Sequence, residues 1–208
     1  MIANNQNMPS RFFDTPNSTI PEVHLLSNGR YHVMITSAGD GYSRWKNLAV
    51  DRCLEDSTCD AWGTYCYLRD VTSGNFWSTT YQPALRQADT YEAVFSEGRA
   101  IFQRRDDAIE TVTEIVVSPE DDGEVRRIRI TNQSGMRRKV DITSYGEIVF
   151  TPSATDSAHP AFNKLFIETE ILRESHVAVG TPIGEVFRLR RNFPQPLPLF
   201  RASISAIP

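Results

Sequence analysis

The sequence has little that would place this chain in a membrane or cross-link it covalently. No run approaches the roughly 20 apolar residues that span a bilayer. Residues 1–10 are polar and Asn-rich, without the apolar stretch of a signal peptide. The three cysteines, Cys53, Cys59 and Cys66, lack C-x-x-C spacing and a nearby histidine. We therefore expect a soluble chain with no membrane insertion and with reduced thiols, without a disulfide framework or zinc site.

Basic stripes and catalytic signatures are also missing. The formal net charge is −4, so nucleic acid is not an expected partner. No G-x-S-x-G elbow, phosphate loop, dinucleotide fingerprint or H-E-x-x-H motif occurs. The histidines stand singly, without the paired spacing of metal ligands; they are His24, His32, His159 and His176. These absences argue against self-contained chemistry, and we expect no catalytic residue, metal or cofactor.

The patterns that are present are those of antiparallel β structure. Short apolar-alternating runs are separated by Gly, Asn, Asp and Ser at hairpin distances, and no long helix interrupts them. The expected strands are residues 31–35, 65–70, 76–81, 91–95, 100–104, 111–117, 125–132 and 139–150. In the last of these, Val140, Ile142, Ile148 and Phe150 share one parity, which predicts one long strand with a buried face.

Many short strands in 208 residues favour two packed sheets, because a single sheet would leave an apolar face in water. We therefore predict an all-β fold, an antiparallel β-sandwich. Its expected parts are an N-terminal arm (residues 1–22), a sandwich domain (23–170) and an irregular, proline-rich tail (171–208). The tail carries Pro194, Pro196, Pro198 and Pro208, which cannot donate to a regular ladder.

An aromatic and cationic cluster follows the expected strand 31–35. Gly39 and Gly41 flank Asp40 in a tight turn, after which Tyr42, Ser43, Arg44 and Trp45 emerge. A flat ring beside a guanidinium and a hydroxyl suits a sugar or an anion. The alternative is that Tyr42 and Trp45 pack in the core and Arg44 is solvated.

The polar loop at residues 156–163 is a second candidate for recognition. It holds His159, Phe162 and Asn163, and an imidazole and a carboxamide there can reach past the sheet edge toward a ligand or partner. In the alternative interpretation, His159 caps a turn and Phe162 plugs one end of the sandwich. Paired acids occur at 55–56, 106–107 and 121–122, but acids beside turns are usually solvated and we expect no catalytic use of them.

Six segments in order resemble one enzyme family. They read LLSNGRY at 25–31, GYSRW at 41–45, WGTYCYLRD at 62–70, YEAVFSE at 91–97, VSPEDD at 117–122 and HPAFNKLF at 159–166. Together they are similar to the glycoside hydrolase family 94 region of cyclic β-1,2-glucan synthases, which is related to cellobiose and chitobiose phosphorylases. The likeness covers roughly residues 11–170.

The resemblance implies a supersandwich, akin to the galactose mutarotase fold, that precedes an (α/α)6 catalytic barrel. The catalytic acid of the family lies in that barrel, so the chain is expected to be inactive alone and to support the barrel. The resemblance also implies a homodimer in which a sandwich loop reaches the partner's active site, with His159, Phe162 and Asn163 as the candidate equivalent. It further implies contact with a β-1,2-glucan or glucooligosaccharide and a cytoplasmic location, the parent synthase being associated with the inner membrane.

The resemblance ends near Glu170, where the expected continuation of the sandwich is not recognisable. This predicts a truncated or frame-altered fragment of a larger synthase, whose missing final strands would expose a sheet edge and favour dimerisation. Two other functions stay open. One is a stand-alone enzyme, mutarotase-like or a small glycosidase, that uses one of the acids with His159. The other is a purely structural interaction domain. Whether the parent synthesises, cyclises or phosphorolyses glucan is also left open.

Overall fold

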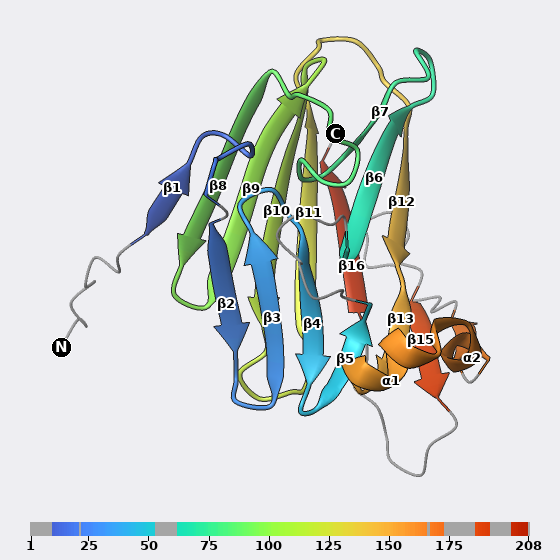
Figure 1. Cartoon of the computed structure of the whole chain (residues 1–208). Coiled ribbons are helices and arrows are strands. Elements are labelled where there is room, and N and C mark those ends of the chain that lie inside the picture. The colour runs from blue at the N-terminus through green and yellow to red at the C-terminus, as the bar shows by residue number, and fades with distance from the viewer. Residues whose placement is uncertain are drawn as a thin grey trace, which may run out of the picture.

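The computed structural model describes residues 10–20, 22–52, 62–165, 167–172, 186–191 and 201–207. Within them the regular secondary structure is almost entirely β-strand (Figure 1). The strands are β1 (Arg11–Phe13), β2 (Val23–Ser27), β3 (Tyr31–Thr36), β4 (Gly41–Trp45), β5 (Leu48–Asp51), β6 (Thr64–Asp70), β7 (Phe76–Ser78), β8 (Thr90–Ser96), β9 (Arg99–Asp106), β10 (Ile109–Val117), β11 (Glu124–Asn132), β12 (Val140–Gly146), β13 (Ile148–Thr151), β14 (Ile167–Leu172), β15 (Val186–Arg191) and β16 (Arg201–Ile207). Two short helices, α1 (Ser153–Ala158) and α2 (Pro160–Lys164), follow β13. In the described ranges, no helix has the length and apolarity to cross a membrane.

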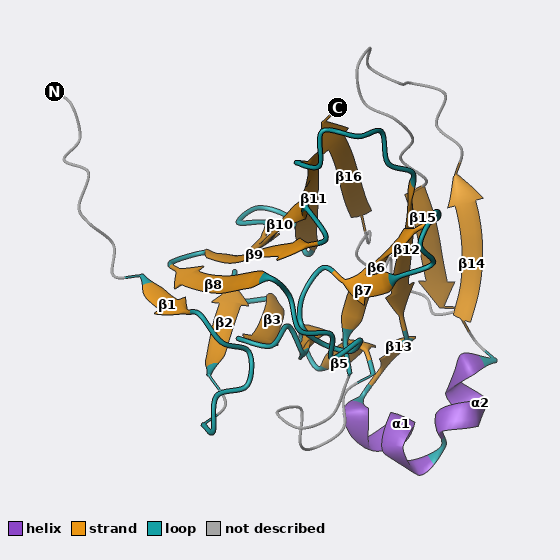
Figure 2. Cartoon of the chain, turned by 90° about the horizontal axis from the view of Figure 1, so that it is seen from above, coloured by secondary structure: helices purple, strands orange, loops and turns teal. Residues whose placement is uncertain are grey.

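Two large sheets pack face to face, as the sandwich prediction requires. One has the order β1-β8-β9-β10-β11-β16 and the other the order β13-β5-β4-β3-β2. Figure 2, seen from above, shows these layers one against the other. The main core cluster draws on both, because Tyr31 and Val33 come from the second sheet whereas Phe95 and Phe102 come from the first. Burial of these facing side chains is the principal stabilising contribution to the fold.

A smaller sheet extends the second layer. Its order is β12-β6-β7, and it packs a second core cluster against the six-stranded sheet. Leu68 and Trp77 of the small sheet meet Ile109, Ile128 and Ile130 there. β14 and β15 pair with each other as a two-stranded sheet beside it.

The expected hairpins are confirmed. In the hairpin of β8 and β9, Thr90 is paired with Arg105 at the open end and Ser96 with Arg99 next to the turn. Gly98 in this turn has a φ of +73°. β9, β10 and β11 continue as an antiparallel meander. Local turn chemistry and period-2 alternation, both readable from the sequence, specify these pairings.

The single long strand expected at 139–150 is wrong. The chain divides at Glu147 into β12, in the small sheet, and β13, in the five-stranded sheet. Val140 and Ile142 pack on the second core cluster, whereas Ile148 and Phe150 pack on the main one. The Glu147 carbonyl accepts a hydrogen bond from the Arg52 amide (2.8 Å), and the register shifts between Ile148 and Thr151. The apolar residues of β12 and β13 thus share one parity but pack in two different core clusters.

The arm contributes a strand to the sandwich, and the expectation of an irregular tail needs correction. In the arm, β1 pairs with β8 and is part of the six-stranded sheet. In the tail, the described residues are strands and not irregular coil, because β16 pairs parallel with β11 along Val125–Thr131. A parallel partner so distant in the chain leaves no local turn signal. The four prolines named above lie outside the described residues.

The sheet edge expected to be exposed by missing strands is covered at β11, because β16 pairs along it. The edge argument for dimerisation therefore does not apply to that strand. The expectation of a loop at 156–163 is also modified, since these residues build most of α1 and α2, with Pro160 at the first position of α2. Proline suits that position because its missing N–H has no intrahelical partner there.

Candidate contact surface

An arginine at the end of β5 fixes the two short helices to the sandwich. Arg52 donates from Nε to Asp156 Oδ2 (2.7 Å) and from Nη2 to Asp156 Oδ1 (2.9 Å). Its Nη1 donates to Glu147 Oε2 (2.6 Å), and Nη2 also reaches the Pro160 carbonyl (3.3 Å). The hydrogen bonds to Asp156 are the main reason why the pKa of Arg52 is raised above its ordinary value. Helices of five and six residues are not stable alone, so this ion pair is central to holding them.

Within the helical segment, Asn163 is buried and acts as an internal tie. Its side-chain Nδ2 donates to the Thr155 carbonyl (3.1 Å), which joins α2 to α1. A side chain held in this way does not reach outward to a ligand. The structure therefore places Asn163 inside the segment and not on its outer face.

His159, Phe162 and Leu165 form the outward part of this segment, and we call these three residues the α1–α2 surface. Phe162 is 58% and Leu165 76% exposed, and His159 is also exposed. The His159 amide caps α1 by donating to the Thr155 carbonyl, but its imidazole makes no capping bond to α2. Phe162 is outside the core clusters, so it does not plug the sandwich. Large apolar side chains gathered on one exposed segment are typical of an interaction site.

The predicted cluster at 42–45 is divided between two faces of β4. Ser43 and Trp45 point inward, where the Ser43 hydroxyl donates to Glu124 Oε2 (2.7 Å) and Trp45 Nε1 donates to Asp122 Oδ2 (2.7 Å). Trp45 is 8% exposed and belongs to the main core cluster, as the alternative interpretation expected. In this conformation the Trp45 ring cannot stack against a sugar, and the Ser43 hydroxyl cannot donate to one.

Tyr42 and Arg44 lie on the outer face of β4 and are half-buried. The Arg44 guanidinium carbon is 5.7 Å from the centre of the Tyr42 ring, a cation–π contact. Arg44 Nη2 also donates to Ser153 Oγ at the start of α1 (3.1 Å). The structure thus links the cluster at 42–45 to the start of α1 through Arg44.

A buried polar network lies between the sheets, and no sequence pattern predicted it. Asp51 accepts hydrogen bonds from the Ser43 amide (2.7 Å) and the Thr64 hydroxyl (3.2 Å). Glu124 accepts from Arg126 Nε (2.7 Å). Burial raises the pKa of Asp51 to about 7, and the nearby Glu124 carboxylate acts in the same direction. Both carboxylates are buried, so a substrate cannot reach them in this conformation.

Two members of the acid pairs singled out in the sequence, Asp106 and Asp122, also stabilise the fold. Asp106, expected to be solvated, is buried and pairs with Arg104 (Nε to Oδ2, 2.7 Å). Asp122 accepts from Arg30 and Trp45, and these two hydrogen bonds lower its pKa. Acids 55–56 lie outside the described residues. No group of three or more His, Cys, Asp or Glu suited to a metal occurs in the part of the chain that the structure describes.

Comparison with known proteins finds a family model and several relatives that match this chain. The family model described as "Glycosyl hydrolase 94, supersandwich domain" matches residues 6–191. Over 167 residues the chain is 36% identical to the cyclic beta-(1,2)-glucan synthase NdvB of Rhizobium meliloti (strain 1021). Over 147 residues it is 26% identical to the N,N'-diacetylchitobiose phosphorylase of Vibrio furnissii. Over 83 residues it is 28% identical to the solabiose phosphorylase of Paenibacillus borealis.

The matches cover much of this chain but little of each relative. They span 80%, 68% and 40% of this chain and 6%, 18% and 11% of the three relatives, respectively. The family match continues to residue 191, so the expectation that recognisable sandwich sequence ends near Glu170 is wrong. β14 and β15 fall inside the matched range.

Proposed function

Because the chain belongs to the glycosyl hydrolase 94 supersandwich domain family, we propose that it is the non-catalytic sandwich module of a larger carbohydrate-active enzyme. The enzyme is of the glucan synthase or phosphorylase type, in line with the relatives' names. The module's role is to hold and orient the catalytic domain of that enzyme. The substrate of the whole enzyme is a β-linked glucan or oligosaccharide.

The observation that carries the proposal is the clamp that presents the α1–α2 surface. Arg52 and Asp156, both buried, and the partly buried Glu147 form an ion-pair network that fixes two short helices at one end of the sandwich. Those helices present Phe162 and Leu165 outward. An apolar surface held rigidly in this way loses little conformational entropy when a partner covers it, which favours binding. The partner we assign to it is the catalytic barrel of the parent enzyme.

The alternative of an enzyme acting by itself has less support. The acid nearest to His159 in the sequence is Asp156, which is buried and accepts two hydrogen bonds from Arg52, so its carboxylate is engaged and shielded. Asp51 and Glu124 are shielded between the sheets. General acid–base catalysis needs a carboxyl group within hydrogen-bond reach of the substrate.

Two measurements test the proposal. The chain is first incubated with β-1,2-glucooligosaccharides and inorganic phosphate, and released glucose 1-phosphate and reducing ends are measured; we expect no turnover above background. The chain is then titrated calorimetrically with a recombinant catalytic domain of an NdvB-type synthase. We expect binding that is at least tenfold weaker for Phe162→Ala combined with Leu165→Ala.

A matched control is Leu25→Ala on β2, because Leu25 is also a large exposed apolar side chain but lies outside the helical segment. This variant should bind the catalytic domain like the unmodified chain. Turnover by the chain alone that is lost in His159→Ala would overturn the proposal. Sedimentation that shows self-association through Phe162 and Leu165, with no binding to the catalytic domain, would instead assign the surface to a second copy of the chain.

A further inference from the structure

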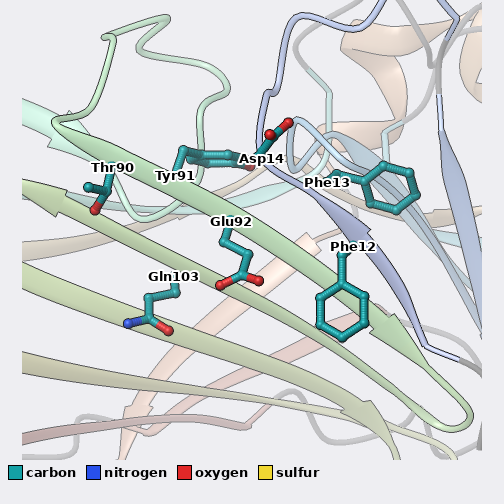
Figure 3. A pocket seen from close by; sticks show the side chains of 7 residues that line it. All are labelled: Phe12, Phe13, Asp14, Thr90, Tyr91, Glu92 and Gln103. Atoms are coloured by element: carbon teal, nitrogen blue, oxygen red, sulfur yellow. The ribbon is translucent and has the colours of Figure 1, made fainter.

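A hollow of about 450 Å³ opens at the other side of the molecule, where β1 ends beside β8. β1 pairs with β8 only along Ala93–Phe95, so the first residues of β8, Thr90 to Glu92, have no partner from β1. The hollow is lined by Phe12, Phe13, Asp14, Thr90, Tyr91, Glu92 and Gln103 (Figure 3). Its volume is within the range of about 300–1,000 Å³ that is usual for small-molecule sites.

The sheet register places an aromatic ring and two polar side chains on one face of this hollow. Glu92 lies directly opposite Gln103, and Phe12 lies opposite Val94, which shares the parity of Glu92. In Figure 3, Phe12, Glu92 and Gln103 lie together on one side of β8, while Tyr91 extends on the other side toward Asp14. Phe12 is 66% exposed, and an exposed aromatic ring can stack against a ligand.

The polar side chains that line the hollow present mainly acceptors. Among the described residues, the carboxylates of Glu92 and Asp14 make no hydrogen bond or ion pair. Gln103 donates its Nε2 to Glu110 Oε1 (2.7 Å), which fixes the carboxamide and leaves its carbonyl oxygen to accept. A complementary ligand therefore carries several donors and one apolar face.

We propose that this hollow binds a neutral saccharide, with one sugar ring stacked on Phe12 and its hydroxyls donating to Glu92 and Gln103 on the same face of β8. Sugar rings combine an apolar C–H face with a rim of hydroxyl donors, which matches this arrangement. The two carboxylates disfavour an anionic ligand such as phosphate. The choice of a glucan as the saccharide rests on the proposed function, whereas the site itself rests on the geometry.

The hollow is separate from the α1–α2 surface. Figures 1 and 2 both show β1 and the two helices on opposite sides of the molecule. A saccharide bound beside β1 therefore leaves the proposed contact with the catalytic domain open. This separation makes the two proposals testable independently, because a variant in one region leaves the other intact.

The test is a titration of the full 208-residue chain with a linear β-1,2-glucooligosaccharide. Binding is measured from the amide chemical shifts in two-dimensional NMR spectra. We expect saturable shifts at Phe12, Glu92 and Gln103. The apparent Kd should rise at least tenfold in Phe12→Ala and in Glu92→Ala. Leu25→Ala is the matched control, since Leu25 is 68% exposed on β2, and its Kd should not change.

Three outcomes would overturn the inference. The first is the absence of saturable shifts in the hollow at millimolar saccharide. The second is an equal loss of binding in Phe12→Ala and Leu25→Ala. The third is a response to tetralysine as strong as the response to the saccharide, since the two carboxylates would then form an electrostatic site. The spectra of the variants report whether each remains folded. Failure here, with catalytic-domain binding retained, would remove the saccharide site and leave the proposed function standing.

Discussion

Arg52 and Asp156, 104 positions apart in the chain, form a bidentate ion pair with N···O distances of 2.7 and 2.9 Å. The pair joins the end of β5 to α1, and Glu147 contributes a third carboxylate contact from the point where β12 gives way to β13. Both side chains of the pair are about nine-tenths buried. The position of the α1–α2 surface therefore depends on one guanidinium.

Replacing Arg52 tests whether its guanidinium holds the α1–α2 surface in place. Arg52→Met should lower the free energy of unfolding by about 3–5 kcal/mol, because it leaves the Asp156 carboxylate buried and unpaired. Urea denaturation followed by circular dichroism measures this loss, and hydrogen exchange should increase most in α1 and α2. Arg127→Met, which removes an exposed arginine paired with Glu114, should change stability by only about 0–1 kcal/mol. Equal losses in the two variants would contradict the assigned role.

Asp51 predicts a pH dependence of stability. Burial raises its pKa to about 7 in the folded chain from the ordinary value of 3.8. Between these values the folded protein holds a proton that the unfolded chain has released, so the Asp51 contribution to stability falls as pH rises, by at most about 1.4 kcal/mol per unit. Its contribution is complete below pH 3.8 and lost above about pH 7.

Asp51→Asn isolates this effect, because an amide does not titrate and can still accept the hydrogen bond from the Ser43 amide. The unfolding free energies of the unmodified chain and the variant, measured in urea from pH 4 to pH 8, should diverge in favour of the variant as pH rises. The difference should stop changing above about pH 7. A constant difference over the whole range would show that Asp51 titrates normally.

Cys66 should be unreactive in the folded protein. It is buried in the second core cluster, and burial raises the pKa of its thiol to about 12. Since the thiolate is the nucleophile, alkylation by iodoacetamide at pH 8 should be slower by a factor of about a thousand than in the urea-unfolded chain. Peptide mass spectrometry reports the rate at Cys66 itself, separately from Cys53 and Cys59. Comparable rates in the folded and unfolded states would mean that the small sheet opens readily.

Gly41 should not tolerate a side chain. A Cβ there would lie 1.9 Å from the Met34 carbonyl oxygen of the neighbouring strand. Gly41→Ala should therefore cost about 4 kcal/mol or more, since two backbones would have to separate. Gly98→Ala is the comparison, because its Cβ would meet open space and only its φ of +73° opposes alanine, at about 1–2 kcal/mol. Thermal unfolding distinguishes them, and a similar melting temperature for both would refute the close approach.

The sequence was sufficient for features that depend on neighbouring residues. The β8–β9 hairpin follows from alternation and turn residues within a few positions and is confirmed, and the expected strands 111–117 and 125–132 do pair as β10 and β11. The sandwich followed from counting apolar faces that needed covering. The break at Glu147 could not be predicted, because the apolar parity continues across it and only the Arg52 amide, far away in sequence, shows where the chain leaves the small sheet.

The candidate site was predicted less well, for the same reason. Trp45 and Ser43 suggested a surface, yet their partners Asp122 and Glu124 are about 80 residues later, and only the fold reveals that both point inward. The role of Arg52 could not be predicted from the sequence, because its partner Asp156 lies 104 positions later in the chain. The position of Phe162 on an exposed segment agrees with its selection from the sequence, although its role stays a prediction.

The parallel pairing of β16 with β11 has a consequence for synthesis of the protein. On the ribosome, residues 125–131 emerge well before residues 201–207, so the nascent sheet presents an open row of amide and carbonyl groups at β11 while the intervening polypeptide is made. Such a row is a template for pairing with other newly made chains. The order of translation therefore creates an interval in which shielding by a chaperone would improve the yield of native molecules.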